Sequence, residues 1–241
     1  MGNLVIAIVQ ARMGSSRLPG KSMADLAGKP LLWQFLQRAK RVTKIDRLVL
    51  ATTIKAQDDI LESVARECSV DVFRGSENDL VQRYYQAAKA FQADIVVRIC
   101  ADNPVIEPTE IDRIIEYHKT GQSDFSSNTH NILGNGYPDG LGAEVFDFKK
   151  LEEVASLAVD PRNREHPHTY FYEHPEKYLI GTVPCPEEFS RPELKLDVNT
   201  PEELAYLRAI YEYCYPRDPN FNITDIIQWH DRNWAAVGTS V

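Results

Sequence analysis

Residues 4–9 form an uninterrupted apolar run, and a loop rich in glycine and cations follows directly at residues 10–21. The run reads Leu-Val-Ile-Ala-Ile-Val, a length and a β-branched content typical of a strand that is buried on both faces. Such strands occur in parallel sheets that helices cover on each side. We therefore expect the loop to leave the carboxyl edge of a parallel sheet, where open α/β folds bind their ligands.

The loop contains the groups that a phosphate site needs. Gly14 and Gly20 can adopt backbone conformations that turn main-chain N–H groups towards an anion. Arg12 and Arg17 can bind phosphate oxygens in a bidentate manner, and Lys21 adds a point charge. A solvent-exposed basic turn is the alternative interpretation. The order of strand, glycine and cation favours a triphosphate site.

The loop differs from a Walker A loop in its spacing. Five residues separate Gly14 from Gly20, whereas a Walker A loop has four and begins a helix at its Lys. The segment after Lys21 lacks a helical pattern, and the next helix is predicted to begin near Pro30. The sequence therefore predicts a nucleotide-binding loop of another kind.

Composition supports one α/β enzyme domain and excludes several other classes. The 241 residues are 43% hydrophobic, which is ordinary for a chain with a large core. The net charge of −8 argues against a nucleic-acid partner, because such binding needs an extended basic surface. No apolar stretch approaches the ~20 residues of a membrane span. The four cysteines form no C-x-x-C pair, so we expect reduced thiols in a cytoplasmic protein.

Strands and helices alternate along the chain as in a parallel sheet with helices on both faces. Strands are predicted at residues 48–52, 70–73, 95–99, 144–146 and 179–183, and helices at 58–67, 78–91, 109–118, 147–156 and 164–174, with a last helix opened at 200. Residues 128–142 are rich in Asn, Gly and Pro, which indicates a functional loop. We expect one domain over residues 1–241, with an inserted segment at about 128–175.

Asp102 follows the predicted strand at 95–99, so we expect it at the same sheet edge as the cation-rich loop. A carboxylate there suits Mg²⁺, which prefers one or two carboxylates together with phosphate oxygens and water. The alternative is that Asp102 only caps a turn before Pro104.

Residues 195–198 are predicted to form a further strand that ends in oxygen ligands. Asp197 and Asn199 alternate along it and so point the same way, as a second metal-binding pair would. The alternative is that Asn199 or Thr200 caps the helix that follows.

Residues 162–174 contain three histidines and a glutamate, a composition that also occurs in transition-metal sites. Pro167 stands between two of these histidines, and no second cluster exists, which argues against that reading. Arg164, Glu165 and His166 fit better as groups that orient a hydroxylated, anionic acceptor, with Arg164 for a carboxylate. A solvated surface turn is the alternative.

Taken together, five motifs resemble those of the sugar-acid cytidylyltransferases. They are the loop at residues 10–21, Arg-Gly-Ser at 74–76, Ala-Asp-Asn-Pro at 101–104, Arg-Glu-His at 164–166 and Asn-Thr-Pro-Glu-Glu at 199–203. The resemblance covers nearly the whole chain and is strongest to the spore-coat polysaccharide biosynthesis protein F-like branch, which is related to acylneuraminate and 3-deoxy-manno-octulosonate cytidylyltransferases. It implies a Rossmann-like nucleotidyltransferase fold: an α/β, GT-A-like three-layer sandwich with a mostly parallel sheet. It also implies CTP and Mg²⁺ as partners, an anionic sugar acceptor, and a homodimer formed through the inserted segment.

The resemblance also implies roles for individual residues. Nucleotide-binding residues are Ala11, Arg12, Gly14, Ser15, Arg17, Lys21, Arg74, Gly75, Ser76 and Asp79, and the catalytic ones are Arg12, Lys21 and Asp102. Acceptor-binding residues are Asn128, Tyr137, Glu144, Arg164, Glu165 and His166, and metal ligands are Asp102, Asp197 and Asn199.

Two positions depart from the family pattern: Ala101 replaces a Gly before the metal-binding Asp, and Asn199 replaces an Asp. The second metal ligand is then expected from Asp197, as in acylneuraminate members with an Asp-x-Asp pair. The expected reaction is attack of an acceptor on the α-phosphorus of CTP with loss of pyrophosphate. A glycosyltransferase of similar architecture that uses a nucleotide sugar, and a non-catalytic nucleotide-binding protein, are the alternatives.

Overall fold

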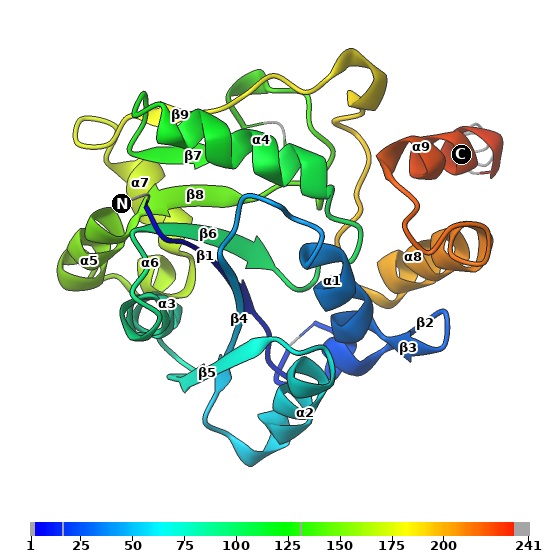
Figure 1. Cartoon of the computed structure of the whole chain (residues 1–241), viewed down its shortest axis with the longest axis horizontal. Coiled ribbons are helices and arrows are strands. Elements are labelled where there is room, and N and C mark those ends of the chain that lie inside the picture. The colour runs from blue at the N-terminus through cyan, green and yellow to red at the C-terminus, as the bar shows by residue number, and fades with distance from the viewer. Residues whose placement is uncertain (1–2, 16, 131, 234–241) are drawn as a thin grey trace.

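The computed structural model describes residues 3–15, 17–130 and 132–233, and it is built around a seven-stranded sheet (Figure 1). The strands lie in the order β5-β4-β1-β6-β8-β7-β9. Their bounds are β1 Val5–Gln10, β4 Arg47–Thr53, β5 Asp71–Gly75, β6 Ile95–Cys100, β7 Phe125–Ser127, β8 Glu144–Asp147 and β9 Ile180–Gly181. The short strands β2 Asp25–Leu26 and β3 Lys29–Pro30 pair separately. Ser16, in the loop that the sequence singles out, lies outside the described residues.

Helices cover both faces of the sheet because its central strands are apolar on both faces. The α-helices are α1 Leu31–Ala39, α2 Asp59–Glu67, α3 Leu80–Ala90, α4 Pro108–Lys119, α5 Phe148–Leu157, α6 Pro161–Glu165, α7 Pro167–Glu173, α8 Pro201–Cys214 and α9 Ile223–Asn233, and short 3₁₀ helices lie at Lys21–Met23, Ala56–Asp58, Ile132–Gly134 and Glu187–Phe189. Val5, Ala7 and Val9 pack with α1, α2 and α4. Ile6 and Ile8 pack with α3, α5 and α7 on the other face. The predicted three-layer α/β sandwich is confirmed.

Strand β8 is antiparallel to its neighbours β6 and β7, while the other neighbouring strands of this sheet are parallel where the structure describes them. β8 belongs to residues 128–175, the segment expected as an insertion. α5, from the same segment, packs against α3. The segment is therefore part of the sheet and of its helical layer, and its expected role in a homodimer stays a prediction.

A third apolar cluster joins α8 and α9 at the edge of the molecule beside α1 (Figure 1). Thr200 and Glu203 form a capping box at the start of α8, so Thr200 has the predicted capping role. The expectation that this helix is the last was wrong, because α9 follows and buries Ile223, Ile226 and Ile227. Among the described residues, the helices are too short or too polar to cross a bilayer.

Three predicted elements differ from the structure. The helix expected at 164–174 is divided into α6 and α7, because Pro167 disfavours the helical conformation of the residue before it, and His166 has φ −126° and ψ 85°. The strand expected at 179–183 is only β9. The strand expected at 195–198 is irregular, and it makes one isolated bridge, between Lys195 and Asp139.

Residues 194–198 nevertheless lie beside the end of β6, because backbone hydrogen bonds hold them there. Asp139 exchanges such bonds with Leu194 and Leu196, and the Val198 amide donates to the Asp102 carbonyl at 2.8 Å. Gly140 makes this approach feasible: it has φ +91°, and a Cβ there would lie 2.7 Å from the Leu196 backbone. The irregular segment thus brings Asp197 and Asn199 to the sheet edge that carries Asp102.

Candidate active site

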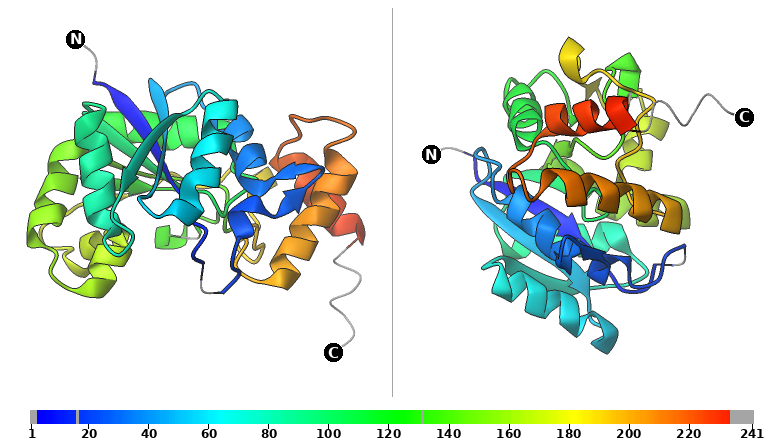
Figure 2. Two further views of the ribbon diagram at one scale, coloured as in Figure 1. Left: turned by 90° about the horizontal axis from the view of Figure 1, so that it is seen from below. Right: turned by 90° about the vertical axis from the view of Figure 1, so that its right-hand side faces the viewer.

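The carboxyl ends of the neighbouring strands β1 and β6 open into a cavity of about 350 Å³. The loop that follows β1 projects beyond this end of the sheet (Figure 2) and forms one wall. The predicted site residues that line the cavity are Ala11, Arg12, Ser15, Arg17, Lys21, Asp102, Glu165 and His166. Lining residues that the sequence analysis did not assign to the site are Gln10, Ser22, Glu77, Asn78, Leu80, Arg83 and Ala101.

The loop is held by a buried carboxylate that sequence reasoning missed. Asp58 is fully buried, and its Oδ1 accepts a hydrogen bond from the Met13 amide at 2.8 Å. The Met13 carbonyl accepts in turn from the amides of Ser15 and Gly20. Gly20 has φ +74°, as expected for a glycine that closes such a turn. Asp58 therefore fixes the backbone of the loop that carries Arg12, Arg17 and Lys21.

Arg12 faces the cavity between the two sides of the site. One of its guanidinium nitrogens lies 3.5 Å from Glu165 Oε1, and another donates to the Glu77 carbonyl at 3.4 Å. Both side chains of the Arg12–Glu165 pair are well exposed, so the pair contributes little to stability. It leaves Arg12 available to an anionic ligand.

Arg83 is a further cation in the cavity wall, and it comes from α3 rather than from the cation-rich loop. Its side chain is buried, and its Nη1 donates to the Ser76 carbonyl at 2.6 Å. Among the described residues its Nε has no hydrogen-bond partner. Burial lowers the pKa of the Arg83 guanidinium, and the nearby Arg12 lowers it further. The signal in the sequence was weak, because Arg83 lies on a helix that otherwise shows ordinary amphipathic spacing.

Lys21 and Asp102 meet at the end of β6. Lys21 Nζ lies 2.9 Å from Asp102 Oδ2, 2.7 Å from the Val198 carbonyl oxygen and 3.3 Å from Asn199 Oδ1. We call these three oxygens the oxygen cage. Asn199 Nδ2 donates to Asp197, so the two side chains are in contact although the segment is not a strand, and their expected role as a pair of metal ligands stays a prediction.

Asp197 is only partly exposed, and burial raises the pKa of its carboxyl to about 6, with Asp139, Glu203 and Asp102 adding repulsion. The ionised carboxylate therefore disfavours the fold above pH 6, whereas far below that value it is protonated in the folded and the unfolded chain alike.

We expect Asp197→Asn to melt at a higher temperature than the parent near neutral pH, because the amide carries no such charge. The gain should shrink as the pH falls through 6 towards 4, the range between the folded and unfolded pKa values. Scanning calorimetry at several pH values measures it. The same gain at every pH would contradict this cause.

Only part of the predicted acceptor group reaches the cavity. Glu165 and His166, at the end of α6, line it. Arg164 lies beneath, where its Nε donates to Asp79 Oδ2 at 3.0 Å and its Nη1 donates to the Ala155 carbonyl at 2.7 Å. Asp79 also caps α3 by accepting from the Gln82 amide. Arg164 and Asp79 thus join α6 to α3 and support the walls of the cavity.

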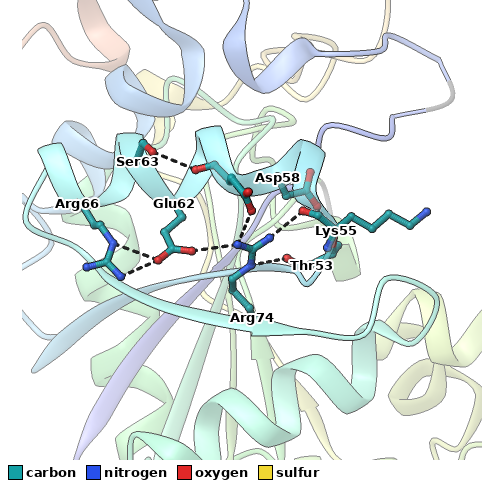
Figure 3. A network of polar contacts seen from close by, with 8 residues as sticks. Thr53, Lys55, Asp58, Glu62, Ser63, Arg66 and Arg74 are labelled. Carbon is teal, nitrogen blue, oxygen red and sulfur yellow. Dashed lines mark hydrogen bonds and ion pairs between the residues drawn. The ribbon is translucent and has the colours of Figure 1, made fainter.

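Arg74 is not brought to the cavity. It pairs with Asp59 at 2.6 Å and with Glu62 at 3.1 Å on α2, and its Nε donates to the Thr53 carbonyl (Figure 3). Gly75 ends β5, and Ser76 contributes its carbonyl to Arg83 rather than a side chain to the cavity. Gly14 lies in the loop after β1 but is not among the residues that line the cavity.

Asn128, Tyr137 and Glu144 are buried structural groups rather than lining residues. The Asn128 side chain bonds the Glu110 carbonyl and the Ala143 amide. The Tyr137 hydroxyl donates to Glu110, and burial raises the pKa of this hydroxyl well above its ordinary value. Sequence alone could not show this, because the partners are distant along the chain.

Glu144 forms an ion pair with Arg98 at 2.7 Å, and both side chains are below 8% exposed. Arg98 Nε also donates to Gln10 Oε1 at 3.2 Å, and Gln10 lines the cavity. His168 Nδ1 lies 3.4 Å from Glu144, and burial lowers the pKa of its imidazole. This polar network adjoins the cavity through Gln10.

Known proteins resemble the chain along most of its length. A family model described as Cytidylyltransferase matches residues 6–216. The spore coat polysaccharide biosynthesis protein SpsF of Bacillus subtilis is 31% identical, over 96% of this chain and 95% of that protein. A 3-deoxy-manno-octulosonate cytidylyltransferase of Trichlorobacter lovleyi is 34% identical, over 46% of this chain and 44% of that protein. The solved structure of a cytidylyltransferase from Leptospira borgpetersenii has a TM-score of 0.88 at 30% identity, covering 100% of this chain and 99% of that one.

Proposed function

The chain belongs to the cytidylyltransferase family, whose members are nucleotidyltransferases, and from this premise we propose that it transfers CMP from CTP to a sugar acid. The observation that carries the proposal is the meeting of three groups at one cavity. They are the cations of the loop after β1, the carboxylate of Asp102 at the end of β6, and the polar residues Glu165 and His166 at the end of α6.

In this proposal the cations of the cavity hold the triphosphate. Arg12 and Arg17 from the loop and Arg83 from α3 bind phosphate oxygens, each charge-assisted bond contributing roughly 1.5–3 kcal/mol. A hydroxyl of the acceptor attacks the α-phosphorus and forms a new P–O bond. The bond from that phosphorus to the bridging oxygen breaks, and pyrophosphate leaves with the electron pair. The hydroxyl proton passes to solvent, since we assign no protein general base.

We propose Mg²⁺ as the cofactor, held by the oxygen cage of Asp102, Val198 and Asn199. The carboxylate, carbonyl and amide oxygens of the cage are the hard ligands that Mg²⁺ takes. Among the described residues, no group of three or more His, Cys, Asp or Glu side chains is placed to hold a metal. The three oxygens of the cage would therefore share the ion with phosphate and water ligands. When bound, the ion neutralises phosphate charge and lowers the pKa of the attacking hydroxyl.

The acceptor is proposed to be an anionic sugar of the octulosonic or nonulosonic acid type, activated for a surface polysaccharide. The names of the Trichlorobacter and Bacillus relatives support this choice. Glu165 and His166 offer hydrogen-bonding groups for sugar hydroxyls. Arg164, which Asp79 already neutralises, keeps that wall in place.

Pyrophosphate release tests the proposal. The protein is incubated with Mg²⁺, each of the four ribonucleoside triphosphates and a panel of eight- and nine-carbon sugar acids. Release with CTP and one sugar acid is expected. Turnover of a nucleotide sugar with loss of a nucleoside diphosphate would favour a glycosyltransferase instead. CTP binding without turnover across the panel would favour a non-catalytic nucleotide-binding protein.

A further inference from the structure

The ammonium group of Lys21 fills the oxygen cage. A lysine ammonium has three N–H donors, and here its three acceptors are Asp102 Oδ2 at 2.9 Å, the Val198 carbonyl at 2.7 Å and Asn199 Oδ1 at 3.3 Å. The Lys21 side chain is only 14% exposed. All three donors of the ammonium are therefore used within the protein.

Negative charge surrounds this position. Asp197 contacts Asn199, and the Asp139 and Glu203 carboxylates interact with Asp197 electrostatically. The Lys21 ammonium pairs with Asp102 at 2.9 Å, whereas Arg12 pairs with Glu165. The nearby negative charge favours a cation at the oxygen cage, and the Lys21 ammonium supplies one from within the chain.

The same oxygens cannot serve an ammonium and a divalent ion at once. A metal would contact them at about 2.0–2.1 Å, closer than the three hydrogen bonds of Lys21, and the two positive charges would repel. A triphosphate in the cavity offers Lys21 other acceptors, because Lys21 itself lines that cavity. The Lys21 ammonium can then bind either the cage oxygens or the phosphate oxygens, and only the first arrangement excludes a metal from the cage.

We propose that Lys21 is a resident cation that keeps the oxygen cage closed to divalent ions until a triphosphate draws the ammonium away. This inference rests on the proposed function, which supplies the triphosphate. It goes beyond phosphate binding, because it makes the position of Lys21 the switch between a closed and a metal-accepting cage. Metal and nucleotide then bind with positive coupling, each raising the affinity for the other.

Binding of Mn²⁺ alone, without nucleotide, tests the inference. Free Mn²⁺ is measured by electron paramagnetic resonance in titrations of the full chain, with Lys21→Met against the parent. We expect Lys21→Met to bind Mn²⁺ at least about tenfold more tightly, because it removes a competing charge from within hydrogen-bond distance of the ligands. Lys55→Met is the matched control. Lys55 pairs with Glu77 near the cavity and does not contact the cage, so its removal should change the affinity less than about twofold.

Two further variants make the result decisive. Lys21→Gln removes the charge but keeps hydrogen-bonding groups, and it replaces Lys21→Met if melting curves show that the methionine variant does not fold. Asp102→Asn combined with Lys21→Met should lose the gained Mn²⁺ affinity, which locates the ion at the cage. Equal Mn²⁺ affinity in the parent and the folded Lys21 variant would overturn the inference.

The outcome is separable from the proposed function. If the parent releases pyrophosphate from CTP while Lys21→Met and the parent bind Mn²⁺ equally well, the inference fails and the proposed function stands. If Lys21→Met binds Mn²⁺ more tightly while the parent releases no pyrophosphate from CTP with any acceptor of the panel, the closed cage is supported and the proposed reaction fails.

Discussion

Asp102→Asn is expected to lower the rate of pyrophosphate release about 1,000-fold or more at saturating CTP and Mg²⁺. Asp102 is the charged member of the oxygen cage and the partner of Lys21, and it lines the cavity at the end of β6. The amide keeps the size of the side chain but removes the charge that holds a divalent cation. The backbone hydrogen bond from Val198 to the Asp102 carbonyl is kept in the variant, and a melting curve separates a loss of turnover from a loss of folding.

A matched control is Asp71→Asn on β5. It removes the same charge from the same sheet, but at an exposed ion pair with Arg47 that lies away from the cavity. Turnover of this variant should remain close to that of the parent. Asp102→Asn with turnover within tenfold of the parent at any Mg²⁺ concentration would contradict the assignment of Asp102 as a metal ligand.

Glu144→Gln is expected to lower the free energy of unfolding by about 3 kcal/mol, because it leaves the buried charge of Arg98 without a carboxylate. For a chain of this length the melting temperature should fall by roughly 6–12 °C. Thermal unfolding followed by circular dichroism measures the change. The sequence suggested an acceptor-binding role for Glu144, and the burial of its side chain predicts a loss of stability instead.

Replacing both partners gives the control for this buried pair. The double variant Arg98→Met, Glu144→Leu leaves no buried charge and should recover most of the lost stability. A single variant that melts within about 2 °C of the parent would show that water, the introduced amide oxygen or the neutral His168 imidazole accepts the hydrogen bonds of Arg98 well enough to keep the fold stable. A double variant no more stable than the single one would show that packing, not charge, sets the effect.

The parts of the fold that local pattern specifies were predictable. β1 and its loop followed from an apolar run that ends at a glycine-rich, cationic segment. The helix boundaries around α2, α3 and α5 followed from ordinary periodicity to within two residues. The cavity-lining residues Arg12, Lys21 and Asp102 were predictable because parallel strands bring their carboxyl ends to one edge.

The rest depends on contacts between distant segments. Asp58 holds a loop that lies 45 positions earlier in the chain, and Arg74 turns to α2 rather than to the cavity. Residues 195–198 alternate in polarity as a strand does. In the structure they are held by backbone hydrogen bonds to Asp139 and Asp102 and not by a regular strand ladder. β7 is three residues long, so its pattern was too short to indicate a strand.

The Arg164–Asp79 pair has a consequence for how such an enzyme could change its acceptor over evolutionary time. It ties α6, at whose end Glu165 and His166 lie, to the N-cap of α3, the helix that contributes Leu80 and Arg83 to the cavity wall. A substitution that tilts α6 would therefore also disturb α3, and under the proposed function it would affect nucleotide and acceptor binding together. Under the proposed function, acceptor choice can diverge at Glu165 and His166 themselves, which line the cavity without forming that joint.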